Sequence, residues 1–485
     1  ESTASVTGDS ADATVTIDAM AGIAIGDGVN NLGIYVEAYV DGLYVELDNS
    51  YGQDVELTYV DVTASIGQVD AETGELLTDA ESGELVAATV MVSEGATPAR
   101  AADMDLYATA VEIELNNDAD ADIDHLDALA QISASATGGS GGSYSDIDAT
   151  AKGLELRGDD FSVITIDDSV GRAEVVLQSD DYAEARAQGI DVYGEYGDLF
   201  IENSKGYAHV DLTLLADGDD HQGRLVADAD GVDLTGLGNG DVREVYGLAE
   251  VELSFGDATA GTVDGDVEGV DVYAEMAVLE SVEGVSRATI TGGASGEDVT
   301  GADLEASLTL RAVDVDGDDV DMTGVTGRAY GDIALGGEAI DADISVYVNA
   351  WGIDAGSYGQ IVGEQLAATN VAGYIDIDID LTSTATGEAG GSVYSEVSAI
   401  ATDLNDDGGL DSLVVVDNVT GEALISTAGT ADDDVRLRAS AEGVELIGDL
   451  GVTGSGVVGH VCDSYSYQCD IRKRVGIDSR TGRKQ

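Results

Sequence analysis

The chain has 485 residues, of which 97 are acidic and only 19 basic, so its formal net charge at pH 7 is −78. Because binding to nucleic acid requires a basic surface, this charge excludes nucleic acid as a direct partner. Apolar residues make up 44% of the chain, which excludes wholesale disorder, and no apolar run approaches the roughly 20 residues of a membrane helix.

The charge also indicates a setting in which self-repulsion is relieved. High salt does so, because the Debye length falls to about 3 Å at 1 M, and bound divalent cations or a basic partner would do the same. The excess of Asp over Lys therefore predicts a halophilic or marine source, or a calcium-loaded surface protein. Since the chain opens at Glu1 without Met, we expect a processed N-terminus and an extracellular or cell-surface location.

Residues 1–30 form an N-terminal extension with one candidate strand. In Ala13–Ile25 every second residue is apolar, so that one face carries Val15, Ile17, Ile23 and Ile25. One interpretation is the first or capping strand of the fold. The other is a donor strand that completes the sheet of a neighbouring subunit through main-chain hydrogen bonds.

Residues 31–143 are expected to form a divergent β-region. Leu32–Leu47 has strong strand character, and Ala38–Leu47 and Leu106–Leu115 are divergent copies of a phrase that recurs later. The region ends in Gly138–Ser143, whose sequence GGSGGS is typical of a linker or of a loop between strands.

Residues 144–460 carry two recurring phrases. The first, A-x-A-x-G-[VI]-[DE]-[VL], places its glycine at Gly153, Gly189, Gly231 and Gly269, and weaker copies place Ala312, Gly352 and Ala401 there. The second, G-x-A-x-V-x-L, falls between the copies of the first and begins at Gly171, Gly206, Gly247, Gly284 and Gly327. A period of about 40 residues is a signal of repeat architecture.

Both phrases alternate apolar with polar residues, which is the pattern of a half-buried strand. In the second copy of the second phrase, Val210 and Leu212 would face the core while His209 and Asp211 face solvent. Since a single strand pair cannot bury its own apolar face, stacked copies must do so. We therefore predict an all-β, elongated, solenoid-like array, with a large antiparallel sandwich or tandem sandwiches as the alternative.

The clearest metal motif is D-x-N-x-D-G-x-L-D. It places oxygen ligands at Asp403, Asn405, Asp407 and Asp411, and it resembles the calcium loop of EF-hands and dockerin-type modules over nine residues. It departs from that loop where Val414 replaces the bidentate carboxylate. The resemblance implies Ca²⁺ bound in a loop, and the alternative is a solvated acidic turn.

A second candidate metal cluster is Asp314, Asp316 and Asp318, where alternate carboxylates share a strand face. Such carboxylates pack poorly without cations. Asp376, Asp378 and Asp380 repeat the pattern. Together these clusters predict divalent cation binding.

Residues 461–485 combine a disulfide loop with a basic tail. Cys462 and Cys469 are the only cysteines, and we expect them to pair in an oxidising compartment, the alternative being two free thiols. The tail, Ile471–Gln485, has six basic residues and one acid, whereas the preceding 470 residues have 13 basic and 96 acidic ones. Its basic residues are Arg472, Lys473, Arg474, Arg480, Arg483 and Lys484.

This contrast suggests that the tail docks on the acidic body of the next subunit. The alternatives are a tail folded onto its own body and a disordered terminus. We therefore expect a secreted structural protein, a subunit of an extracellular filament or surface layer that binds itself head to tail. The alternatives are a calcium-dependent adhesin or biofilm-matrix protein, which would contact a surface polysaccharide, and a β-helix enzyme acting on polysaccharides.

The sequence does not favour an enzyme. Its four His residues are scattered, and no G-x-S-x-G, H-E-x-x-H or P-loop motif occurs. The arginines occur about once per phrase, which predicts local ion pairs. Trp351, the sole tryptophan, is expected in the core or at an interface.

Overall fold

The fold was analysed in a computed structural model. It describes residues 3–7, 15–23, 34–47, 54–70, 73, 75–80, 82–91, 101–116, 119–137, 144–158, 162–195, 197–215, 223–255, 260–295, 302–338, 342–356, 365–383, 389–404, 413–430, 435–448, 451–455, 458–463 and 475–477. This part of the chain is all-β and contains no helix, so no helix in it is long and apolar enough to cross a membrane.

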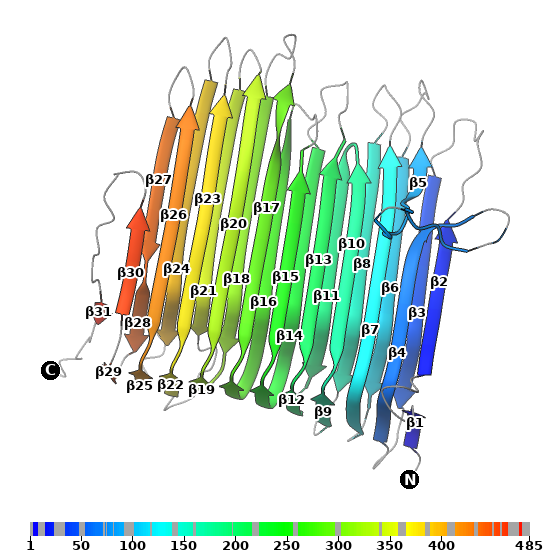
Figure 1. The fold of residues 1–485 in the computed structure, drawn as a ribbon, viewed down its shortest axis with the longest axis horizontal. Helices are drawn as coiled ribbons and strands as arrows, with labels where there is room; N and C mark the ends of the chain where they lie inside the picture. The colour runs from blue at the N-terminus through cyan, green and yellow to red at the C-terminus, as the bar shows by residue number, and fades with distance from the viewer. Residues whose placement is uncertain are drawn as a thin grey trace.

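The strands stack in three parallel ladders along one long axis (Figure 1). Sheet A contains β3 (Ile34–Leu47), β6 (Ala101–Leu115), β8 (Tyr144–Gly158), β11 (Tyr182–Gly194), β14 (Gly223–Arg243), β16 (Ala260–Glu280), β18 (Ala302–Asp316), β21 (Ala342–Gly356), β24 (Ala389–Leu404), β27 (Val435–Glu442), β28 (Val444–Gly448) and β31 (Val475–Ile477).

Sheet B contains β2 (Val15–Ile23), β4 (Asp54–Gln68), β7 (Asp120–Thr137), β10 (Val170–Ser179), β13 (Lys205–Leu214), β15 (Tyr246–Ser254), β17 (Glu283–Ser295), β20 (Thr326–Glu338), β23 (Ala372–Ser383), β26 (Thr420–Thr430) and β30 (Val458–Asp463), and β5 (Ala88–Met91) pairs with β7. Ribbon C contains β1 (Thr3–Thr7), β9 (Val163–Asp167), β12 (Asp198–Glu202), β19 (Asp319–Thr323), β22 (Gln365–Thr369), β25 (Leu413–Asp417) and β29 (Gly451–Ser455), together with the first residues of β4 and β7 and the last of β14 and β16.

Each coil runs through sheet A, then ribbon C, then sheet B. One coil is β11, β12 and β13, after which β14 lies beside β11 and begins the next coil. Sheets A and B run in opposite directions and enclose the core between them (Figure 1). The predicted solenoid-like array of stacked repeats is therefore confirmed.

The two phrases occupy the two sheets. The first forms the strands of sheet A and the second those of sheet B. The predicted alternation holds, since Val210 and Leu212 are buried while His209 and Asp211 are half-exposed on the outer face. Copies of a phrase stack in register, so that each buried residue lies on an equivalent residue of the next coil.

The recurring glycines mark where the two sheets come closest. A Cβ atom added to Gly247 would lie 1.9 Å from the carbonyl oxygen of Gly269, and one added to Gly206 would lie 1.8 Å from that of Gly231. The glycines of sheet B therefore accommodate backbone carbonyls of sheet A. Alignment by the strand pairing corrects one prediction, because Ala399 rather than Ala401 stacks on Gly352; the phrase is offset by two residues there.

A column of residues with left-handed backbone turns each coil from ribbon C, or its equivalent in β4 and β7, into sheet B. Its φ values lie between 44° and 69°, and the N–H of most members donates to a carbonyl of the next coil. The column consists of Tyr59, His125, Asp168, Asn203, Glu244, Ser281, Gly324, Asn370 and Asn418. Asn, Asp and Gly adopt this conformation most readily, which explains the polar residues at the corners.

Candidate functional site

A row of acidic residues crosses seven adjacent strands on the outer face of sheet A. Each member lies two residues after the glycine position of the first phrase, and each pairs in register with the next across about 4.8 Å. We call this row the acidic ladder: Glu112, Glu155, Asp191, Asp233, Asp271, Asp314 and Asp354. Although it faces outward, its members are buried or half-buried.

The backbone explains this burial. The paired register passes over the glycine of the first phrase, so the residue just before the glycine and the residue two positions after it both face outward. A second row therefore lies against the acidic ladder, with Gln188, Asp230, Glu268 and Arg311 on successive strands. The side chains of these two outward rows therefore crowd one another on the outer face of sheet A, which explains the burial of the acidic ladder.

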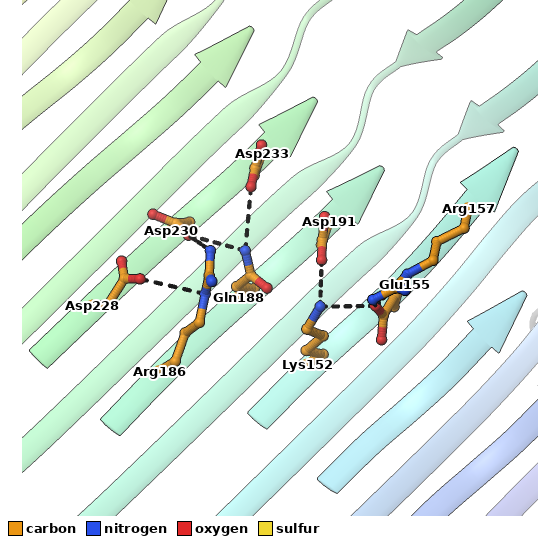
Figure 2. Close-up of polar contacts among 9 residues, drawn as sticks. All are labelled: Lys152, Glu155, Arg157, Arg186, Gln188, Asp191, Asp228, Asp230 and Asp233. Carbon is orange, nitrogen blue, oxygen red and sulfur yellow. Dashed lines mark hydrogen bonds and ion pairs between the residues drawn. The ribbon is translucent and has the colours of Figure 1, made fainter. Parts of the chain in front are cut away.

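At its N-terminal end the acidic ladder is neutralised by basic residues (Figure 2). Lys152 Nζ donates to Glu155 at 2.8 Å and to Asp191 at 2.6 Å, and Arg157 Nη2 donates to Glu155 at 2.6 Å. Burial opposes the charges of Lys152 and Glu155, but their attraction wins, so the pKa of Lys152 is raised and that of Glu155 is lowered.

Next along the ladder, Arg186 and Gln188 bind the carboxylates of β14 (Figure 2). Arg186 lies 3.4 Å from Asp228 and 3.5 Å from Asp230. Gln188 Nε2 donates to Asp230 at 3.0 Å and to Asp233 at 3.3 Å. The carboxylates of Asp228, Asp230 and Asp233 therefore share one guanidinium group, at 3.4 Å or more, and one uncharged amide.

In the C-terminal half, Arg311 compensates the negative charge only in part. Glu268, Asp271 and Asp314 offer carboxylate oxygens within 4.8 Å of one another, which is an arrangement that can hold a metal ion. Arg311 contacts Glu268 and lies 3.5 Å from Asp314, but within the described ranges no basic side chain forms an ion pair with Asp271.

The pKa values reflect this crowding. Burial, with repulsion from Asp354, raises the pKa of Asp314 to about 8. Burial, with repulsion from Asp191, raises the pKa of Asp233 to about 7. The pKa of Asp271 is raised well above its usual range by burial and by the charges of Glu268 and Asp314. This half of the ladder therefore favours either protons or bound cations.

Two members of the ladder, Asp191 and Asp233, line a groove made of two joined depressions of about 480 Å³ and 410 Å³. The first lies over β6, β8, β11 and β14, and the second continues toward β16 and the turn at Gly317. Tyr193 and Thr235 line both depressions, so the two depressions form one elongated groove across the strands.

The structure brings one of the predicted calcium ligands into this site. Asp314 meets Glu268 and Asp271 of the neighbouring strand β16 rather than Asp316 and Asp318 of its own segment, although the charge of Asp316 acts on Asp314. Asn405, Asp407 and Asp411 lie outside the described residues, and Asp403 is described only as backbone near the end of β24. The calcium-loop prediction therefore stays a prediction.

The assembly residues are placed only in part. Ile17 packs against the core from β2, where Val15 is half-buried on the same face; β2 pairs with β4 of the same chain, and Ile23 ends the strand. Ile25, Cys469, the linker Gly138–Ser143 and the six basic tail residues lie outside the described residues, and Cys462 is described only as backbone in β30.

The arginines form local ion pairs between coils, as predicted. Examples are Arg224 with Asp264 at 2.9 Å and Arg172 with Asp127. Trp351 does not lie in the core, which was one of the two places predicted for it. Its ring is half-buried on the outer face of sheet A, with the Arg311 guanidinium 5.3 Å from the ring centroid. The cation–π contact explains that place.

Sequence reasoning did not identify the acidic ladder, although its signal was present. The first phrase itself contains an acid two residues after its glycine. What the phrase does not show is that the copies stack in register, which brings these acids to one strand spacing from each other. No protein-family model matches the chain, and neither the curated proteins nor the solved structures gave a significant match.

Proposed function

We propose that the chain is an extracellular structural subunit that assembles end to end into filaments. The observation that carries this proposal is the pair of open sheet edges. At the N-terminal end, β2 and β3 pair only with β4 and β6 among the described strands. At the other end, β30 and β31 pair only with β26 and β28 within the described part of the chain.

Open edges present rows of main-chain donors and acceptors that invite another strand. Because each ladder is parallel, a second copy translated along the long axis brings its β2 beside β30 with the strand direction preserved. Such a head-to-tail contact does not close and generates a filament. The basic tail, Ile471–Gln485, would add attraction to the acidic body of the neighbour.

Negative-stain electron microscopy tests this proposal with a matched pair of variants on β2. Ile17 faces the core and Asp18 is exposed on the outer face of the same strand. An inward-pointing charge blocks edge pairing, so Ile17→Lys should give single rods. Wild type and Asp18→Lys should give fibres of uniform width.

Deletion of Ile471–Gln485 tests the tail separately and should also leave single rods. Fibres in the deletion would remove the tail from the proposal, whereas single rods of wild type would contradict assembly itself.

A calcium-dependent surface adhesin is the second candidate. It is favoured by the carboxylate cluster of Glu268, Asp271 and Asp314, which would bind Ca²⁺ through oxygen ligands from the two neighbouring strands β16 and β18. An adhesin would act as a monomer, so the same electron micrographs distinguish the two candidates.

A further inference from the structure

The first depression of the groove contains two buried acceptors without donors. Gln188 is 1% exposed, and its Nε2 donates to Asp230 and Asp233, yet its Oε1 has no hydrogen-bond partner among the described residues. Asp233 Oδ1 is also buried and has no hydrogen-bond partner in the described ranges. Buried acceptors are normally satisfied, so this pair indicates that a donor from outside the chain completes the site.

The same depression offers spare donors. Lys152 has three N–H groups and uses two contacts, to Glu155 and Asp191. Arg157 binds Glu155 through Nε and Nη2, which leaves Nη1 without a partner among the described residues. A ligand that both donates and accepts hydrogen bonds fits these groups, and hydroxyl groups do both.

The charge of the depression is balanced, unlike that of the rest of the chain. Three basic and three acidic residues line it, and these are Lys152, Arg157, Arg186, Glu114, Asp191 and Asp233. On a body with a net charge of −78, a polyanion would be repelled. An uncharged ligand meets no such barrier.

Aromatic rings extend the site along the groove. Tyr193 is 48% exposed and Tyr273 is 42% exposed, and their strands, β11 and β16, lie two strand spacings apart, roughly 9.5 Å. Tyrosine presents an apolar face with a polar edge. Two such faces in one elongated groove suit successive rings of a chain-like ligand.

We propose that this groove binds an extended, uncharged polysaccharide, with Tyr193 and Tyr273 under sugar rings and Gln188, Asp233, Lys152 and Arg157 bonding to hydroxyl groups. A cation alone would use the carboxylates but neither the spare donors nor the tyrosine faces. The site lies on the side of the array, away from its ends, so it is independent of the proposed assembly.

Affinity electrophoresis of the full chain tests the inference. Native gels would contain dextran, laminarin or galactomannan as neutral probes and alginate as the acidic probe, all in the presence of a chelator. At least one neutral polysaccharide should retard the wild-type chain, and alginate should not. Tyr193→Ala and Gln188→Leu should each weaken the apparent affinity about tenfold or more.

Tyr347→Ala is the matched control, because Tyr347 is 44% exposed on β21 of the same sheet but does not line the groove. It should bind like wild type. If Gln188→Leu fails to fold, Tyr193→Ala carries the test, since its ring is at the surface. The inference is overturned if no neutral gel retards the chain, or if Tyr193→Ala binds as tightly as the control.

Discussion

At the scale of single residues, the closest approach of the two sheets depends on glycine. A methyl group on Gly247 would overlap the carbonyl oxygen of Gly269, which belongs to backbone that cannot move without disturbing the register of sheet A. We expect Gly247→Ala to lower the free energy of unfolding by about 3 kcal/mol or more. Chemical denaturation followed by circular dichroism measures the loss.

Gly240→Ala is the control for this prediction. Gly240 is also buried and lies in β14, but a Cβ atom there meets its nearest neighbour, Ala274 Cβ, at 3.5 Å, which is ordinary contact. The change should alter stability by less than about 1 kcal/mol. Equal losses in the two variants would show that the distance to the carbonyl is not what requires glycine.

The column of residues with left-handed backbone allows a substitution that should stabilise the fold. Glu244 has φ of 50° and an exposed side chain, so it bears the cost of left-handed backbone without a compensating burial. Glu244→Gly should raise the free energy of unfolding by about 1 kcal/mol. Gly324→Ala, at φ of 69° in the same column, should lower it by a similar amount, and denaturation midpoints would reveal both.

At the scale of the element, the acidic ladder predicts how stability depends on pH. The folded-state pKa values of Asp233 and Asp314, about 7 and about 8, lie above the ordinary value of Asp. The folded state therefore holds protons that the unfolded state releases. This stabilisation is complete below about pH 4 and is lost as the pH rises through 8.

In the presence of a chelator, the melting temperature should therefore fall between pH 5 and pH 8. Asp314→Asn should flatten part of this fall and raise the melting temperature at pH 8 by about 3 °C or more. Asp376→Asn, on the exposed face of β23, is the matched control. If the melting temperatures of wild type and Asp376→Asn rise between pH 5 and pH 8, burial and repulsion of these carboxylates do not control stability.

Calcium should relieve the same repulsion. Binding only to the folded state stabilises it, by about 2.7 kcal/mol when the free ion exceeds its dissociation constant a hundredfold. Millimolar Ca²⁺ at fixed ionic strength should raise the melting temperature of wild type, and Asp271→Asn should abolish most of the rise. An unchanged shift in Asp271→Asn would place the ion elsewhere, and no shift in wild type would remove calcium from the site.

Much of the fold could be predicted from the sequence, because alternation and a period of about 40 residues dictate strands and their stacking. The site could not, since its geometry comes from register across strands. Asp314 meets Glu268 and Asp271, which precede it by more than 40 residues, rather than the acids beside it in sequence. Ribbon C was also missed, because strands of five residues such as β12 and β19 are too short to show a period.

At the scale of the whole molecule, the array is one-dimensional, and each coil contacts only its neighbours. Lys205 and Tyr246 occupy equivalent positions in consecutive coils, since they pair in register in sheet B. Deleting Lys205–Val245 therefore removes one complete coil and joins Ser204 to Tyr246. β12 would then pair with the end of β16, and β15 would pair with β10, with inward and outward faces preserved.

This deletion should give a folded protein whose array is shorter by about 4.8 Å, one strand spacing. Small-angle scattering measures the length, and circular dichroism measures the strand content per residue. Deleting Lys205–Tyr246 instead shifts the register by one residue, which would turn apolar side chains outward over the following strand. That protein should aggregate or lose strand signal, and equal behaviour of the two deletions would contradict the view that in-register stacking of whole coils holds the molecule together.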